Sequence, residues 1–232
     1  MLDPVHYGIW LVVVTAEIFS LACMIRGKAL AEHFTILLYL CACLASEFGA
    51  HAVLTTSGYN SDAYYYFFFY SKSVLTICLY FVLMGLYSHV FSEMGAGKYI
   101  RAGAALILAG TAGISYYMVA TSSEKLVTHF AVELDQNLYF VGVILTYLLW
   151  FAMSRLRENR TRVTQLVLSM GVYVSLSAGS YAINNLYPLL DRFWEYYFPI
   201  TSMWLPLSWA YTFLKVPADT RLATAKVLAP TP

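Results

Sequence analysis

The sequence predicts an all-α membrane protein, a bundle of seven transmembrane helices, from its composition and its run of apolar segments. Hydrophobic residues make up 60% of the chain and charged residues only 12%, whereas about a quarter of a soluble domain is charged. Each apolar segment approaches or exceeds the roughly 20 residues with which an α-helix crosses a bilayer core. The expected spans are Val5–Ile25, His33–Thr56, Ala63–Phe91, Tyr99–Ala120, Val132–Ser154, Val163–Tyr187 and Trp194–Lys215.

The spans occupy nearly the whole chain, so residues 1–217 are predicted to form a single transmembrane domain, followed by a short cytoplasmic tail at residues 218–232. The opening segment, residues 1–6, contains no Lys or Arg and is not expected to be a cleavable signal peptide.

The basic residues predict the orientation, because Lys and Arg are enriched in cytoplasmic connections. If successive spans cross the membrane in alternating directions, the side that holds the N-terminus receives only two basic residues, Lys125 and Arg192. We therefore expect the N-terminus outside and the C-terminus in the cytoplasm. The other side receives Arg26, Lys28, Lys98, Arg101, Arg155, Arg157, Arg160, Arg162, Lys215, Arg221 and Lys226.

The predicted outer face collects acidic residues. We interpret them as a solvated rim that results from excluding Lys and Arg from this side, with a cation-attracting vestibule as the alternative. The residues are Asp3, Asp62, Glu124, Glu133, Asp135, Asp191 and Glu195.

Glu17, Glu47 and Lys72 each lie deep inside a long apolar span, away from its ends. A charge in the membrane interior costs a few kcal/mol and usually marks a functional site. Glu47 and Lys72 lie at similar depths in consecutive antiparallel spans, which predicts that they form an ion pair, with either a structural or a ligand-binding role. The candidate ligand or ion cluster is Glu17, Glu47, His51, Lys72, Thr76 and Tyr80.

Cofactor chemistry receives little support from the sequence. His33 and His89 fall at the inner ends of adjacent spans and are candidate haem or pigment ligands. Retinal is not expected, because the last span offers only Lys215, at its cytoplasmic end. Cys41 and Cys43 point to different sides of a helix, which argues against a metal site. Motifs of common enzymes, such as HExxH, GxSxG and Walker A, do not occur.

Small residues at four-residue spacing predict close helix packing, within the bundle or, alternatively, between copies of the chain. These are Ala105, Ala109 and Gly113 in the fourth span, and Gly171, Ser175 and Gly179 in the sixth.

Three segments carry a resemblance to a known group. They are the aromatic run Tyr66–Tyr70, the basic connection Arg155–Arg162 and the ending Trp209–Pro217. Together they resemble seven-helix membrane proteins of unknown role that are abundant in acidobacterial genomes. The resemblance implies a bacterial cytoplasmic (inner) membrane location and transfers no catalytic residue.

We therefore expect a non-enzymatic ligand-binding or sensing module that acts through a protein partner at its cytoplasmic face or within the membrane. We expect membrane lipid to surround the protein, and we do not expect it to bind nucleic acid. The alternative is an accessory scaffold subunit of a membrane electron-transfer or photosynthetic complex. A proton-coupled carrier ranks third, because the chain shows no evident internal repeat.

Overall fold

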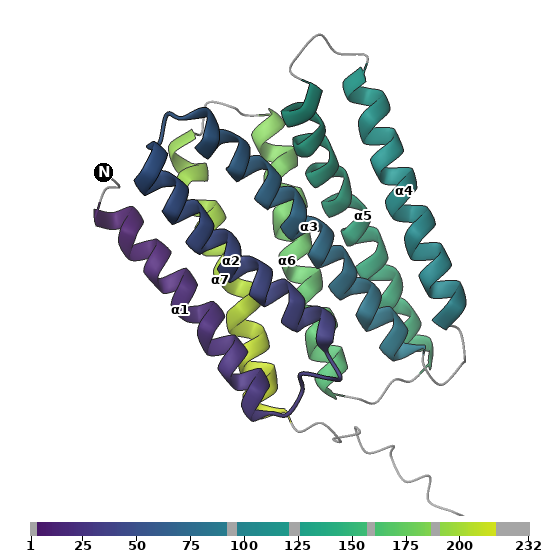
Figure 1. Cartoon of the computed structure of the whole chain (residues 1–232). Coiled ribbons are helices and arrows are strands. Elements are labelled where there is room, and N and C mark those ends of the chain that lie inside the picture. Colours follow the sequence, from purple (N-terminus) through teal and green to yellow (C-terminus); the bar gives the residue numbers. More distant parts are fainter. Residues whose placement is uncertain (1–3, 92–96, 121–125, 157–160, 187–190, 217–232) are drawn as a thin grey trace, which may run out of the picture.

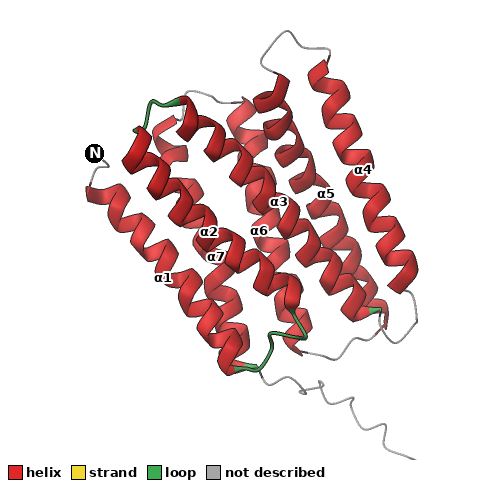
Figure 2. Ribbon diagram, viewed as in Figure 1, coloured by secondary structure: helices red, strands yellow, loops and turns green. Residues whose placement is uncertain are grey.

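The computed structural model describes residues 4–91, 97–120, 126–156, 161–186 and 191–216. This part of the chain contains seven helices and no strand, which confirms the predicted fold class (Figure 2). The predicted tail lies outside the described residues. The helices are α1 (Pro4–Arg26), α2 (Phe34–Ser57), α3 (Asp62–Val90), α4 (Gly97–Ala120), α5 (Leu126–Leu156), α6 (Thr161–Leu186) and α7 (Asp191–Lys215).

Six helices, α1 to α6, are both long enough and apolar enough to cross a membrane, so the protein is a multi-pass integral membrane protein. The seventh predicted span, α7, has 25 residues and contains Pro199 and Pro206. It is not among those six, yet it packs along α1 and α6 as a full member of the bundle. Large apolar side chains such as Leu106, Ile144 and Phe151 are exposed on the outside, as a lipid-facing surface requires.

Six helices form a closed ring, and the fourth lies outside it. Around the ring α1 packs against α2, α2 against α3, α3 against α5, α5 against α6, α6 against α7, and α7 back against α1. Helix α4 contacts α5 and, less extensively, α3, and it lies at one edge of the bundle (Figure 1). The interior of the protein is therefore bounded by every helix except α4.

The tight connection between α2 and α3 makes these two helices antiparallel neighbours. Gly58 adopts a positive φ of 83° where α2 ends. Three residues later the Ser61 hydroxyl accepts a hydrogen bond from the backbone N–H of Tyr64, at 3.1 Å. This N-cap satisfies one of the free N–H groups at the start of α3.

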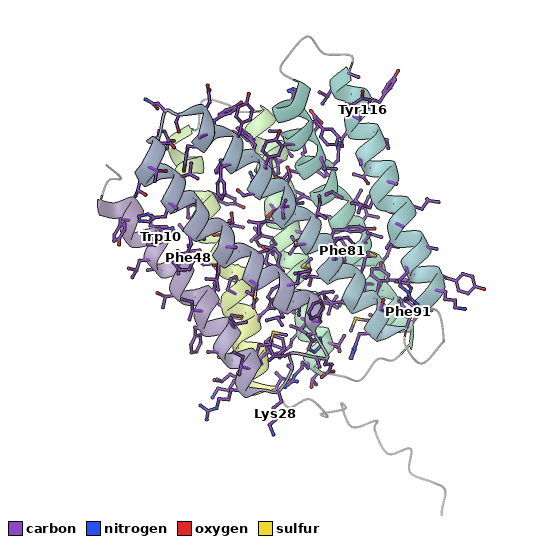
Figure 3. The ribbon with its side chains drawn as sticks, viewed as in Figure 1. Trp10, Lys28, Phe48, Phe81, Phe91 and Tyr116 are labelled. Carbon is purple, nitrogen blue, oxygen red and sulfur yellow. The ribbon has the colours of Figure 1, made fainter. Side chains whose placement is uncertain are left out.

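Apart from Lys72 and Arg192, the Lys and Arg residues of the described helices and connections lie at one end of the bundle. Arg26 and Lys215 lie in the last turns of α1 and α7, and Lys28 marks the same end in Figure 3. Arg162, at the start of α6, is 5% exposed and donates from Nε and Nη2 to the Val216 carbonyl at 3.0 and 2.7 Å. Which end faces the cytoplasm remains a prediction. Asp3, Glu124, Lys125, Arg157, Arg160, Arg221 and Lys226 lie outside the described residues.

Helix α5 begins at Leu126, six residues before the predicted start of the fifth span. Asp135 therefore lies well inside a helix, where its side chain is 2% exposed. Its assignment to the solvated acidic rim is wrong.

The small-residue pattern of α4 does not pack inside the bundle. Ala105, Ala109 and Gly113 are exposed, so packing of this ladder within the bundle was a wrong prediction. In α6 the expectation holds at Gly171, where an added Cβ would lie 3.1 Å from the Thr146 side chain of α5. The exposed ladder is explained by the place of α4 outside the ring.

Candidate functional site

A cavity of about 580 Å³ lies inside the ring. Side chains from α1, α2, α3, α5, α6 and α7 line it, and its volume falls within the range of small-molecule binding sites. Four charged residues reach the cavity: Glu17, Glu47, Lys72 and Asp135. The ring thus brings together charges from α1, α2, α3 and α5.

Lys72 of α3 forms an ion pair with Asp135 of α5. The Lys72 Nζ lies 3.7 Å from Asp135 Oδ2. The hydroxyl groups of Thr76 and Tyr181 donate hydrogen bonds to the two oxygens of the same carboxylate, and the ammonium lies 5.0 Å from the centre of the Tyr181 ring. A buried carboxylate is tolerated when it is paired and hydrogen-bonded in this way.

The predicted ion pair between Glu47 and Lys72 is wrong: both residues line the cavity, but no described contact within ion-pair distance joins them. The reason is that α3 packs against α5 as well as α2. Because the sequence placed Asp135 on the outer rim, the true partner was not considered.

Glu17 and Glu47 form a second charged group, on α1 and α2. Glu17 is 5% exposed, and its Oε2 has no hydrogen-bond partner among the described residues. The two carboxylates are close enough to interact electrostatically, and Glu47 also hydrogen-bonds with the Trp10 side chain. No described basic residue lies within ion-pair distance of either glutamate.

Two residues of the predicted cluster lie off the cavity. His51 stacks on Trp10 with ring centroids 5.0 Å apart, so it supports the indole that bonds Glu47; Phe48 lies against the same indole (Figure 3). The hydroxyl of Tyr80 donates to the Ala104 carbonyl at 2.7 Å and thereby fastens α4 to the ring. The other four predicted residues, Glu17, Glu47, Lys72 and Thr76, line the cavity.

A row of polar side chains lies between the two charged groups along the cavity wall. The hydroxyls of Tyr139 and Tyr173 are 3.4 Å apart. Tyr173 is also hydrogen-bonded to Tyr39, which in turn contacts Cys43, near both glutamates. Sequence reasoning missed these tyrosines, although Asp135 and Tyr139 follow each other at helical i, i+4 spacing on one face of α5.

His33 and His89 meet at the basic end of the bundle, as predicted, but in a geometry that does not fit a haem. Their ring centroids are 5.5 Å apart at an angle of 50°, and Phe213 packs against His33 at 5.7 Å. A bis-histidine haem requires the porphyrin between two opposed imidazoles, whereas these rings pack on each other. The carboxylate of Glu32 lies 3.8 Å from His33 Nε2 and 3.5 Å from His89 Nε2.

His33, in the connection before α2, is expected to make stability depend on pH. Burial lowers its pKa to about 4, and His89 and Arg162 act in the same direction against the opposing effect of Glu32. Between pH 6.5 and 4 the unfolded chain therefore binds a proton here that the folded protein excludes. Stability should fall by up to about 3 kcal/mol as the pH drops through this window.

Thermal unfolding in detergent from pH 7.5 to 4 tests this expectation at about 0.5 pH intervals, a spacing that samples a one-proton transition. The wild type should lose more stability than His33→Gln, whereas His129→Gln, at a half-exposed position, should follow the wild type. Parallel curves for the wild type and His33→Gln would show that His33 does not titrate in this way.

No protein-family model, curated protein or solved structure matches this chain. The functional argument therefore rests on the cavity and on the residues that line it.

Proposed function

We propose that this integral membrane protein is a ligand-binding module and that a small molecule occupies the cavity inside its helical ring. The observation that carries the proposal is the cavity itself, which is large enough for a small organic molecule and has a largely apolar wall that also carries polar and charged groups. Residues of six helices line it, as expected of a binding site placed between the helices of a bundle.

The arrangement of the cavity between the helices supports a sensing role. A ligand in the cavity contacts α1 and α2 on one side and α5 and α6 on the other, so binding favours one packing of the ring over another. Pro199 and Pro206 of α7 also line the cavity. Proline removes a backbone hydrogen bond from a helix, and α7 is therefore the helix best suited to change shape. We propose that a protein partner at the basic end reads this change.

The native Cys43 provides a test of the cavity, because it is a lining residue. In the full-length protein with Cys23, Cys41 and Cys78 replaced by alanine, Cys43 is the remaining thiol. We expect methyl methanethiosulfonate, a small neutral reagent, to modify Cys43 in the folded protein in detergent, as measured by mass spectrometry over time.

Filling the cavity should slow this reaction. Ser177 lines the cavity, so Ser177→Phe should reduce the rate several-fold. Ser154→Phe, at an exposed position near the end of α5, is the matched control and should leave the rate unchanged. An unreactive Cys43, or equal rates in the two variants, would contradict an accessible cavity. Thermal unfolding curves verify that both variants are folded.

A further inference from the structure

We infer that the ligand is an organic cation, such as a primary or quaternary ammonium compound, whose charge lies beside Glu17 and Glu47. The inference rests on the proposed ligand-binding function of the cavity and specifies the chemical class of the ligand.

The first argument is the charge balance of the cavity wall. Three carboxylates and one ammonium line the cavity. Lys72 neutralises Asp135, which also receives two hydroxyl hydrogen bonds. Glu17 and Glu47 are left as neighbouring carboxylates with no described basic residue beside them. Two adjacent carboxylates in an apolar site require a shared proton or a cation, because like charges raise the cost of ionising both.

The second argument is independent of charge. The Glu17 side chain is 5% exposed and lines the cavity, and its Oε2 accepts no hydrogen bond from the described residues. Buried acceptors are nearly always satisfied in native proteins. An ammonium group in the cavity supplies the missing N–H donor, or places its positive charge against this oxygen.

The third argument concerns the body of the ligand. The aromatic side chains of Trp10, Phe68 and Phe69 line the same cavity. Aromatic faces attract organic cations and also accept apolar substituents. A bare metal ion fits less well, because no group of three His, Cys, Asp or Glu among the described residues can hold one.

The charge of the reagent that modifies Cys43 provides the test. In the background where Cys43 is the remaining cysteine, we compare 2-(trimethylammonium)ethyl methanethiosulfonate with the anionic 2-sulfonatoethyl reagent. Each rate is divided by that of the neutral methyl reagent, which cancels differences in thiol reactivity. We expect the cationic reagent to be favoured over the anionic one by about tenfold or more, as for other charged clefts.

Substitutions assign the preference to the two glutamates. The double variant Glu17→Gln, Glu47→Gln should lose it, whereas Glu133→Gln, an acidic residue of α5 away from the cavity, should keep it. Phenethylamine should protect Cys43 from the neutral reagent in the background where both glutamates are present and Cys43 is the remaining cysteine. It should not protect Cys43 in the double glutamine variant. Phenylacetate, the matched anion, should give no protection.

The outcomes separate this inference from the proposed function. A neutral reagent that fails to reach Cys43 contradicts the cavity, and both proposals are then abandoned. If the neutral reagent reacts, but the cationic reagent is not favoured and phenethylamine does not protect, the cavity is supported and a cationic ligand is rejected. That result would favour a proton shared between Glu17 and Glu47. A preference that survives the double substitution would also reject the glutamates as the cation site.

Discussion

Replacing Lys72 by methionine is expected to destabilise the folded protein by about 3–5 kcal/mol, because it leaves the buried Asp135 carboxylate without its cation. Asp135→Asn should also destabilise the protein, but by less. The side chain of Lys72 is 35% exposed, against 2% for that of Asp135, so a stranded ammonium reaches a more polar environment than a stranded carboxylate. The double variant should recover much of the loss, since neither charge is then left alone.

Thermal unfolding in detergent measures these effects as differences between matched variants. The control is a second cycle that combines Lys72→Met with Glu47→Gln. Since the structure pairs Lys72 with Asp135, we expect the losses in this second cycle to be close to additive. Strong coupling between Lys72 and Glu47, with additivity between Lys72 and Asp135, would overturn the ion pair described here.

Hydropathy predicted the helices well because a membrane-spanning segment must be both apolar and about 20 residues long. The second span was expected at His33–Thr56, and α2 runs from Phe34 to Ser57. The start of α5 was missed because its first turns contain polar residues, among them His129 and Glu133. Hydropathy locates the apolar centre of a helix and not its end. Because the start of α5 was placed too late, Asp135 was assigned to the outer rim and not to the interior.

The order of helices around the ring could not be predicted from the sequence. A short connection correctly indicated that α2 and α3 are neighbours. The contacts of α3 with α5 and of α1 with α7 join helices that are not consecutive in the chain. Helix α4, which lies between α3 and α5 in the sequence, packs outside the ring. The partner of Lys72 depends on the first of these contacts, and the outward direction of the Ala105–Gly113 ladder depends on the position of α4.

The charged residues of the first three spans come together in the structure: Glu17, Glu47 and Lys72 all line one cavity. Their location in the outer half of the membrane stays a prediction. Glu47 lies ten residues before the end of α2, and Lys72 lies ten residues after the start of α3. At the helical rise of 1.5 Å per residue both are about 15 Å from the same end of the bundle. The cavity therefore lies nearer the end opposite the basic residues.

Cysteine labelling is expected to show an all-or-none difference between the two ends of the bundle. In a chain whose four native cysteines are replaced by alanine, Asn60→Cys lies in the connection between α2 and α3. A membrane-impermeant maleimide added to intact cells should label it, because this end is predicted to face outward. Asn159→Cys, within the basic connection Arg155–Arg162, should be labelled only after the membrane is opened, because basic connections remain in the cytoplasm.

The same experiment decides the side from which a ligand reaches the cavity. With the predicted orientation, the glutamates lie in the outer half of the bilayer, the proposed ligand would arrive from outside, and the proposed partner would lie inside the cell. The denatured protein should react at both cysteines, which controls for intrinsic reactivity. If Asn159→Cys alone were labelled in intact cells, the protein would have the orientation opposite to the predicted one. Glu17 and Glu47 would then face a cytoplasmic ligand, and the basic end would be outside.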